Sequence, residues 1–270
     1  MTPSATSAPL TLSTQDRVNQ RIYHARNISR WYRSAALDYA EIMALLRYQP
    51  AFAGREVLDM GVGTGRTTRY LAPLAQRYVC LDSSPPMVAY VRERWPGIDI
   101  HLADMRDLGA FASGSFDFVL ASCNLIDAVS HEDRLRVLAE VRRVLRPGGI
   151  FVFTSHNRRL RTALSGPSLG RSLNPARQAL FAWQYLCSLV NHARVRGLRR
   201  IEQDYALLND SGHEYAALHY YVDRDTQRRQ LDRAGFAVRE ILDAAGRLLG
   251  EGDDDSDSAS LLYVAERRSD

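Results

Sequence analysis

Two hydrophobic periods alternate along the middle of the chain. Between residues 55 and 154, short apolar runs typical of buried strands are each followed by a segment with apolar residues every three or four positions, the spacing of one helix face. This alternation predicts a parallel sheet with helices on both faces. The five strands predicted here are Glu56–Asp59, Tyr78–Leu81, Asp99–Leu102, Phe116–Ala121 and Ile150–Thr154.

The same pattern returns near the end of the sequence. Asp223 is placed to cap a helix over Arg224–Ala234, and the runs Phe236–Leu242 and Leu261–Glu266 predict two more strands that form a hairpin. The seventh strand would then run antiparallel to its neighbours. The expected fold class is α/β, a seven-stranded, mostly parallel sheet with helices on both faces.

The flanking segments differ from this core in composition. Residues 1–14 are rich in Ser, Thr and Pro and lack the basic start and apolar stretch of a signal peptide, so a disordered tail is expected. Arginine and aromatic residues mix in the helical pattern that follows, which either packs on the edge of the core or places Tyr23 or Tyr32 over a ligand. The domains predicted are an N-terminal helical lid over 15–50, a core over 51–157 and 223–270, and an inserted cap, a helix plus a β-hairpin, over 158–222.

The inserted cap begins with an apolar helix. Ala176 to Val190 carries apolar residues around much of its circumference, which predicts burial in a cap or an interface, with contact to a membrane or a lipid substrate as the alternative. Four arginines follow in His192 to Arg200. They form either a solvated face or a binding surface for an acidic substrate or nucleic acid, and no interleaved aromatic residues support RNA.

The second half of the cap predicts a β-hairpin. Alternate side chains of a strand share a face, so Tyr215, His219 and Tyr221 should point one way and Tyr220 the other. Over strands four and five, such a hairpin would form a lid above the ligand. Its strands are predicted over Ile201–Leu208 and Glu214–Val222, joined by the turn residues Asn209-Asp210-Ser211-Gly212.

A glycine-rich turn joins the first strand to the next helix. Gly61, Gly63 and Gly65 occupy every second position, which lets a ligand approach the backbone closely. The spacing differs from the G-x-G-x-x-G of a pyrophosphate site. Asp59, which closes the strand, suits a ligand with amino and hydroxyl donors and would repel a diphosphate.

Polar residues recur where the predicted strands end. Because ligands bind at the carboxyl edge of an open parallel sheet, five such residues at one edge indicate a binding site. A carboxylate after the second strand suits a ribose diol, since it accepts two O–H bonds. These residues are Asp59, Asp82, Asp104, Asn124 and His156.

Composition excludes several chemistries. The chain of 270 residues is 46% hydrophobic, enough for a sizeable core, and its net charge of +4 does not by itself indicate nucleic acid. All 35 basic residues are arginine, so no lysine Schiff base, pyridoxal phosphate anchor or Walker lysine exists.

The cysteines and histidines point away from metal and disulfide scaffolds. Cys80, Cys123 and Cys187 lie far apart, and the seven histidines lack ligand spacing, so no metal is expected. The free thiols indicate a reducing, cytoplasmic location. The longest apolar stretch is too short to span a bilayer.

Taken together, five motifs resemble those of class I S-adenosylmethionine-dependent methyltransferases. They are V-L-D-M-G-V-G-T-G-R, C-L-D-S-S-P-P-M, A-D-M-R-D-L, F-D-F-V-L-A-S-C-N and L-R-P-G-G, all within residues 55–154. The resemblance implies a Rossmann-like methyltransferase fold with S-adenosylmethionine as cofactor.

The resemblance also implies roles for individual residues. The three glycines would line the methionine half of the cofactor, Asp82 would hold the ribose hydroxyls and Met87 would lie near the adenine. Asp104 would accept from the adenine amino group, Met105 would offer a backbone N–H, and Asn124 would lie near the sulfonium. The cofactor-binding residues expected are Asp59, Gly61, Gly63, Gly65, Asp82, Ser83, Met87, Asp104, Met105, Asn124 and Tyr32.

The function expected is methyl transfer to the oxygen or nitrogen of a small-molecule acceptor bound under the cap. His156 is the first candidate for a general base because it follows strand five, and His219 and Tyr221 come next. No nucleic-acid partner is expected, and a homodimer is compatible with the sequence. The alternatives are an RNA or protein methyltransferase, a non-catalytic S-adenosylmethionine-binding module and, last, a nicotinamide-dependent dehydrogenase.

Overall fold

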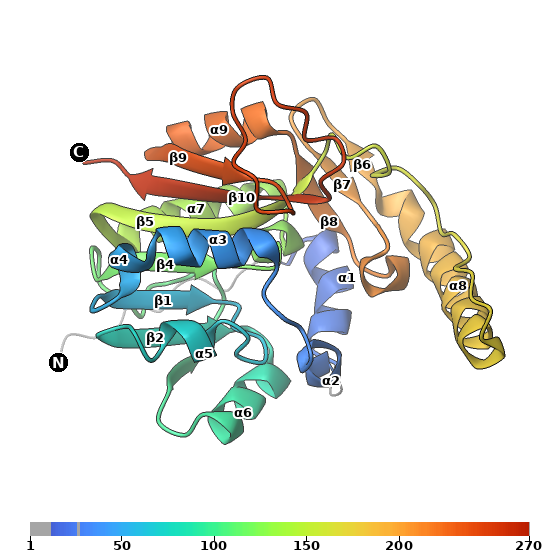
Figure 1. Cartoon of the computed structure of the whole chain (residues 1–270), viewed down its shortest axis with the longest axis horizontal. Helices are drawn as coiled ribbons and strands as arrows, with labels where there is room; N and C mark the ends of the chain where they lie inside the picture. The colour runs from blue at the N-terminus through green and yellow to red at the C-terminus, as the bar shows by residue number, and fades with distance from the viewer. Residues whose placement is uncertain (1–11, 26–27, 270) are drawn as a thin grey trace.

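The structure, a computed structural model, describes residues 12–25 and 28–269 and is built around one mixed sheet (Figure 1). Its main path runs in the order β3-β2-β1-β4-β5-β8-β7-β6, and β10 joins β5 and carries β9 on its far side. The strands are β1 Glu56–Met60, β2 Arg77–Asp82, β3 Asp99–Leu102, β4 Phe116–Ala121, β5 Leu145–Asn157, β6 Arg200–Ile201, β7 Ala206–Leu208, β8 His219–Val222, β9 Phe236–Leu242 and β10 Ser260–Arg267.

Helices and single 3₁₀ turns connect these strands. The α-helices are α1 Thr14–Tyr23, α2 Ile28–Tyr32, α3 Tyr39–Arg47, α4 Gln49–Phe52, α5 Thr68–Leu71, α6 Pro85–Arg94, α7 His131–Val144, α8 Pro175–Val195 and α9 Arg224–Arg233. The 3₁₀ turns are η1 Leu125–Ala128, η2 Arg196–Leu198 and η3 Gly212–Tyr215.

The seven predicted strands form the core of the sheet. β1 to β5 pair in parallel, whereas β10 runs antiparallel to both β5 and β9. Successive side chains of a strand point to opposite faces, so Val57 packs with α3, α4 and α6 while Leu58 packs with α7 and α9. The predicted α/β fold, with helices on both faces and the seventh strand antiparallel, is confirmed.

β5 is longer than predicted and explains where the inserted hairpin lies. It begins at Leu145 instead of Ile150 and continues to Asn157, beyond the last residue that pairs with β4, Phe153. Beyond Phe153, β4 leaves this edge of β5 without a partner strand, and β8 pairs with it in parallel at His156 and Asn157. The hairpin β7–β8 therefore extends the sheet in its own plane, and the expectation of a hairpin stacked over strands four and five was wrong.

The turn of this hairpin also differs from the prediction. Residues 212–215 form η3 instead of the start of a strand, and His213, Glu214 and Tyr215 adopt left-handed backbone angles with φ of 49°, 54° and 64°. Tyr215 therefore does not share a strand face with His219 and Tyr221.

The first two helices, α1 and α2, lie at the carboxyl edge of the sheet (Figure 1). Ser13 caps α1 in a reciprocal capping box, so the chain is already ordered within the segment predicted as a tail; residues 1–11 lie outside the described part. Two buried amides fix this helix. Gln15 donates to the carbonyl of Asp127, and Asn19 exchanges hydrogen bonds with the backbone of Leu218.

The apolar helix of the insert is not buried by the rest of the chain. α8 projects from the edge of the sheet that carries β6 to β8 (Figure 1). Along this helix, the side chain that is buried is Val195, near its end. Among the described residues, no helix combines the length and the apolar character needed to cross a membrane.

Candidate active site

A pocket opens at the carboxyl edge of β1, β2 and β4. Gly61 and Gly63 line its floor in left-handed conformations with φ of +60° and +57°. A Cβ on Gly63 would meet only the carbonyl oxygen of Gly61, 3.9 Å away, so the missing side chain leaves that space to a ligand. The turn is held down by Val62, whose N–H donates to the carbonyl of Leu81 at 3.0 Å.

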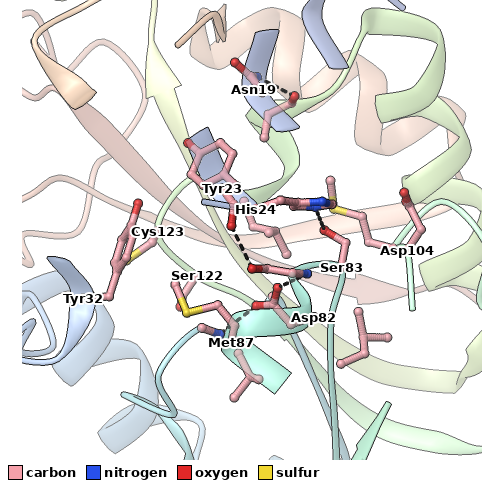
Figure 2. A pocket seen from close by; sticks show the side chains of 18 of the residues that line it. Asn19, Tyr23, His24, Tyr32, Asp82, Ser83, Met87, Asp104, Ser122 and Cys123 are labelled. Atoms are coloured by element: carbon pink, nitrogen blue, oxygen red, sulfur yellow. Dashed lines mark hydrogen bonds between the residues drawn. The ribbon is translucent and has the colours of Figure 1, made fainter. Parts of the chain in front are cut away.

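Asp82 ends β2 beside this turn (Figure 2). Its Oδ2 accepts the N–H of Gly63 at 2.9 Å, and its Oδ1 accepts the N–H of Ser84 at 2.8 Å. The carboxyl is 9% exposed, and burial raises its pKa in spite of the two backbone hydrogen bonds. The remaining lone pairs of both oxygens can accept hydrogen bonds from a ligand in the pocket.

The residues after β2 and β3 form one end of the pocket. Ser83, Met87, Asp104 and Met105 all line it, as the resemblance implied. Asp104 is already engaged, because Arg106 donates to its Oδ1 from Nε at 2.9 Å and to its Oδ2 from Nη2 at 2.7 Å.

Arg106 also ties the lid to the core. Its buried guanidinium pairs with Asp16 on α1 at 3.1 Å and with Asp133 on α7 at 2.8 Å. The same cation therefore fixes Asp104 at the pocket wall and the helix that covers the pocket.

Two of the predicted cofactor residues lie behind the pocket. Asp59 is 1% exposed and accepts hydrogen bonds from the hydroxyls of Thr67 and Tyr78, at 2.5 Å and 2.6 Å. Burial raises its pKa to about 6, and it anchors the turn instead of facing a ligand. Gly65 lies against Trp95, whose ring would be 2.3 Å from an added Cβ. Neither residue lines the pocket.

The other end of the pocket is lined by Tyr23, Tyr32 and Cys123 (Figure 2). Asn124 also lines the pocket. Tyr23 and Tyr32 come from α1 and α2, the segment for which the lid interpretation predicted a tyrosine over a ligand. Cys123 and Asn124 follow β4, both with φ of 54°. Non-glycine residues rarely adopt this conformation, and strained backbone of this kind clusters at functional sites.

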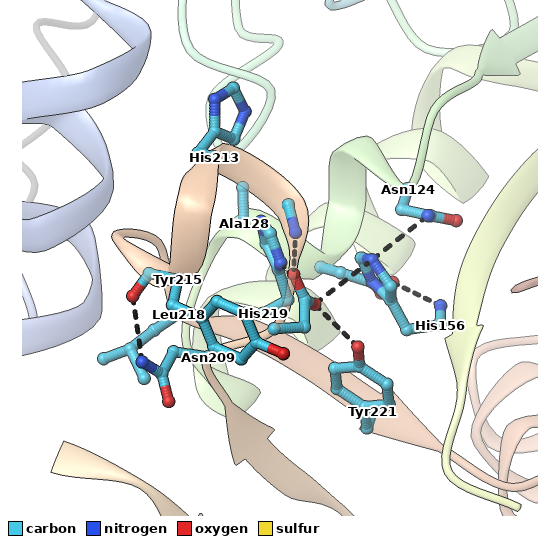
Figure 3. Close-up of polar contacts among 12 residues, drawn as sticks. Asn124, Ala128, His156, Asn209, His213, Tyr215, Leu218, His219 and Tyr221 are labelled. Atoms are coloured by element: carbon cyan, nitrogen blue, oxygen red, sulfur yellow. Dashed lines mark hydrogen bonds and ion pairs between the residues drawn. The ribbon is translucent and has the colours of Figure 1, made fainter. Parts of the chain in front are cut away.

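Three histidines, His156, His213 and His219 (Figure 3), form hydrogen bonds with side chains that line this end of the pocket. The Tyr23 hydroxyl lies 3.2 Å from Nε2 of His219. The Tyr32 hydroxyl lies 2.8 Å from Nε2 of His213.

The third histidine contacts an amide. Asn124 Nδ2 donates to Nε2 of His156 over 3.2 Å. Each of these three pocket side chains is thus held by a histidine from β5 or the inserted hairpin.

A buried carboxylate orients His156. Asp127 accepts the His156 N–H at 2.6 Å and its Nδ1–H at 2.8 Å, and it is ion-paired to the fully buried Arg134. Burial opposes its ionisation, but Arg134 and His156 hold the pKa of Asp127 below its usual value. The bond from Nδ1 leaves the lone pair of Nε2 facing Asn124.

A second carboxylate orients His219. Asp210 Oδ2 accepts from His219 Nδ1 at 2.8 Å and from the Tyr221 hydroxyl at 2.6 Å. Burial opposes both ionised forms, but their pairing lowers the pKa of Asp210 and raises the pKa of His219. By contrast, burial and the neighbouring His219 lower the pKa of His213 to about 4, so His213 is neutral at pH 7.

The three residues predicted as catalytic come together but do not line the pocket. The ring of His156 lies 4.8 Å from those of His219 and Tyr221. His219 and His156 contact the lining of the pocket through Tyr23 and Asn124, and a catalytic role for the three residues stays a prediction. The two histidine rings lie nearly parallel, at 15°, and the ligand atoms of His156, Asp210 and His219 all lie within 4.8 Å of one another.

Sequence reasoning missed the two carboxylates that organise this cluster. Asp210 was assigned to turn chemistry, and Asp127 was passed over although it follows Asn124 by three positions. The position of each acid was a usable signal, because each lies in a segment that ends at the carboxyl edge of the sheet, where ligands bind.

Replacing Asp210 with asparagine is expected to lower the pKa of His219, because the negative charge that favours the imidazolium is removed. The titration of the His219 Cε1 proton by NMR measures this shift. The exposed Asp225 provides a matched control as Asp225→Asn. An unchanged His219 titration in the first variant would show that Asp210 does not set the charge of this histidine.

Comparison with known proteins identifies the fold and the domain. Residues 57–149 match a family model described as a methyltransferase domain. A probable S-adenosylmethionine-dependent methyltransferase of Mycolicibacterium smegmatis is 36% identical over 107 residues, 39% of this chain and 40% of the relative. A malonyl-[acyl-carrier protein] O-methyltransferase of Pectobacterium atrosepticum is 33% identical over 130 residues, 46% of this chain and 47% of the relative. The chain thus spans less than half the length of these curated relatives.

A solved structure extends the similarity over the whole chain. The Burkholderia thailandensis 1,6-didemethyltoxoflavin-N1-methyltransferase superposes with a TM-score of 0.60 and 14% identity, and the match covers 97% of this chain and 94% of that protein. At this identity the similarity establishes the fold. The family model places a methyltransferase domain over residues 57–149, and the relatives that match there are S-adenosylmethionine-dependent methyltransferases, so the cofactor of this domain is S-adenosylmethionine.

Proposed function

We propose that this protein transfers a methyl group from S-adenosylmethionine to an oxygen or nitrogen atom of a small molecule held between the glycine turn and α1. The observation that carries the proposal is one continuous pocket with two chemically different ends. Asp82 and Met87 line one end. Tyr23, Tyr32 and Asn124 line the other, each on a histidine support.

The first end fits the cofactor. Gly63 leaves space for its methionine part, and Asp82 has acceptor lone pairs for a ribose diol. Met87 and Met105 supply apolar contact for an adenine, and Asp104 retains acceptor capacity for the amino group. When bound there, S-adenosylmethionine supplies an already activated, electrophilic methyl group.

The second end can align an acceptor and take up its proton. α1 covers the pocket and limits the access of water. We propose that the acceptor gives its proton to the Tyr23 oxygen while the Tyr23 proton passes to Nε2 of His219, which accepts it only in the neutral form of the ring. Asp210 stabilises the resulting imidazolium through Nδ1–H.

The remaining candidates have positioning roles in this scheme. Asp127 and His156 hold Asn124 at the strained turn, and Tyr221 holds Asp210. The named acceptors of two similar proteins, a malonyl group on a carrier protein and 1,6-didemethyltoxoflavin, show that related chains methylate an oxygen and a nitrogen.

A screen of phenols, sugars, carboxylic acids and amines for formation of S-adenosylhomocysteine tests this function. With the best acceptor, Tyr23→Phe is expected to lower kcat by about 100-fold, because the proton path is interrupted while the ring is kept. His219→Gln should cost a similar factor, and the double variant little more, since the two residues act as one unit. Tyr205→Phe, outside the pocket, is the matched control.

Normal turnover by Tyr23→Phe would remove this residue from the mechanism. If Tyr32→Phe alone lost activity, the proton path would run instead through His213. If no acceptor of any class were methylated by a chain that binds the cofactor, the non-catalytic binding module would be the better description.

A further inference from the structure

The inserted helix α8 exposes several large apolar residues to solvent, while two of its polar residues bond to the rest of the chain. Gln178 accepts the N–H of Ser172 at 2.7 Å, and Asn191 donates to the carbonyl of Glu214 at 3.0 Å. The helix also carries a stripe of large apolar residues at intervals of three or four positions. Their exposed fractions are Leu180 52%, Trp183 65%, Leu186 56% and Val190 48%.

A helix that packs on a core buries its apolar stripe, whereas the stripe of α8 is exposed. The loop before α8 adds to this exposed apolar surface. Leu164, Leu169 and Leu173 are exposed as well. α8 has 21 residues and is therefore about 31 Å long, and it projects beyond the sheet (Figure 1). An apolar surface of this extent on a projecting helix indicates a binding surface.

The charge of the same segment is one-sided. Residues 158–201 contain nine arginines and neither aspartate nor glutamate. Within the described residues, five of these arginines are exposed and have no carboxylate partner, so their charge is available to a binding partner. They are Arg171, Arg177, Arg194, Arg196 and Arg200.

The one-sided charge discriminates between the surfaces that could cover the stripe. A second copy of the chain in a two-fold contact would bring the same arginines against one another. An anionic bilayer accepts both features, because its headgroups attract arginine and its acyl boundary takes up Trp and Leu side chains.

We propose that the surface formed by residues 158–201 is a docking site for anionic lipid membranes. α8 lies in the plane of the headgroups with Trp183 and Leu186 inserted. The arginines at both ends of the helix contact lipid phosphates. This attachment is independent of the methyl-transfer function, and it places the catalytic domain at a membrane surface.

Co-sedimentation of the full chain with vesicles tests the proposal. Binding is expected to vesicles of phosphatidylglycerol and phosphatidylcholine, to weaken with salt, and to be lost with phosphatidylcholine alone. Arg177→Gln/Arg194→Gln/Arg196→Gln should weaken partitioning by about 100-fold, at roughly fivefold per arginine. Trp183→Ser/Leu186→Ser should weaken it at least about tenfold.

Matched controls separate these effects from general charge and hydrophobicity. Arg69→Gln/Arg228→Gln/Arg233→Gln removes the same charge elsewhere, and Leu46→Ser/Tyr70→Ser removes exposed apolar side chains elsewhere. Both should bind vesicles like the wild type, and all variants should retain S-adenosylhomocysteine binding.

Three results would overturn the proposal. The first is wild-type protein that stays in the supernatant with anionic vesicles at low salt, and the second is equal loss of binding in the control variants. The third is a stable dimer, measured by light scattering, that Trp183→Ser/Leu186→Ser converts to a monomer, because the stripe would then be a protein interface.

Discussion

Replacing Asp82 with alanine is expected to weaken S-adenosylhomocysteine binding by at least about 100-fold. The carboxylate offers the pocket its acceptor for a ribose diol, and each hydrogen bond to a charged group contributes about 1.5–3 kcal/mol. The variant also leaves the N–H groups of Gly63 and Ser84 without their acceptor, so the turn that forms the floor loses its anchor. Isothermal titration measures the affinity.

Two further variants calibrate this result. Asp82→Asn keeps a carbonyl acceptor but not the charge, and an intermediate loss is expected. Asp99→Ala removes an exposed acid from the opposite end of the neighbouring strand and should bind like the wild type. Unchanged affinity in Asp82→Ala would mean that the ligand does not contact this carboxylate.

Replacing Asp127 with alanine is expected to destabilise the protein by about 3–5 kcal/mol, the cost of leaving one partner of a buried ion pair alone. Asp127 and Arg134 are both fully buried, and the carboxylate also accepts from Ser155 and twice from His156. Its loss leaves the buried Arg134 charge with neutral partners, Ser155 and Gln227, and releases the ring of His156. Denaturant unfolding measures the free-energy difference.

The surface pair of Asp232 and Arg268 provides the control, since Asp232 is 63% exposed and Asp232→Ala should cost less than about 1 kcal/mol. The double variant Asp127→Leu/Arg134→Met should recover part of the lost stability, because no buried charge is left unpaired. A loss below about 1 kcal/mol in Asp127→Ala would contradict the structural role given to this pair.

The sheet could be predicted from the sequence because its signals are local. The runs over Asp99–Leu102, Phe116–Ala121 and Phe236–Leu242 have the bounds that the pattern predicted. The glycine turn and Asp82 could be placed because each directly follows a strand.

The supporting layer of the pocket could not be predicted, because it joins distant segments. Tyr23 meets His219 across 196 positions, and Tyr32 meets His213 across 181. These contacts depend on β8 pairing with the end of β5. The local pattern of residues 145–157 does not predict a strand of this length, because it passes through Pro147 and two glycines. The hydrogen bonds that hold Asp59 behind the pocket could not be predicted for a related reason: its partner Tyr78 lies on the neighbouring strand.

Titration of S-adenosylhomocysteine into the wild-type chain, with adenosine and a nicotinamide dinucleotide as comparison ligands, tests most directly whether the pocket beside the glycine turn binds the cofactor. Saturable one-to-one binding of S-adenosylhomocysteine, tighter than that of adenosine and without measurable binding of the dinucleotide, is the result expected. Absence of S-adenosylhomocysteine binding at millimolar concentration, or preference for the dinucleotide, would contradict the assignment of this pocket.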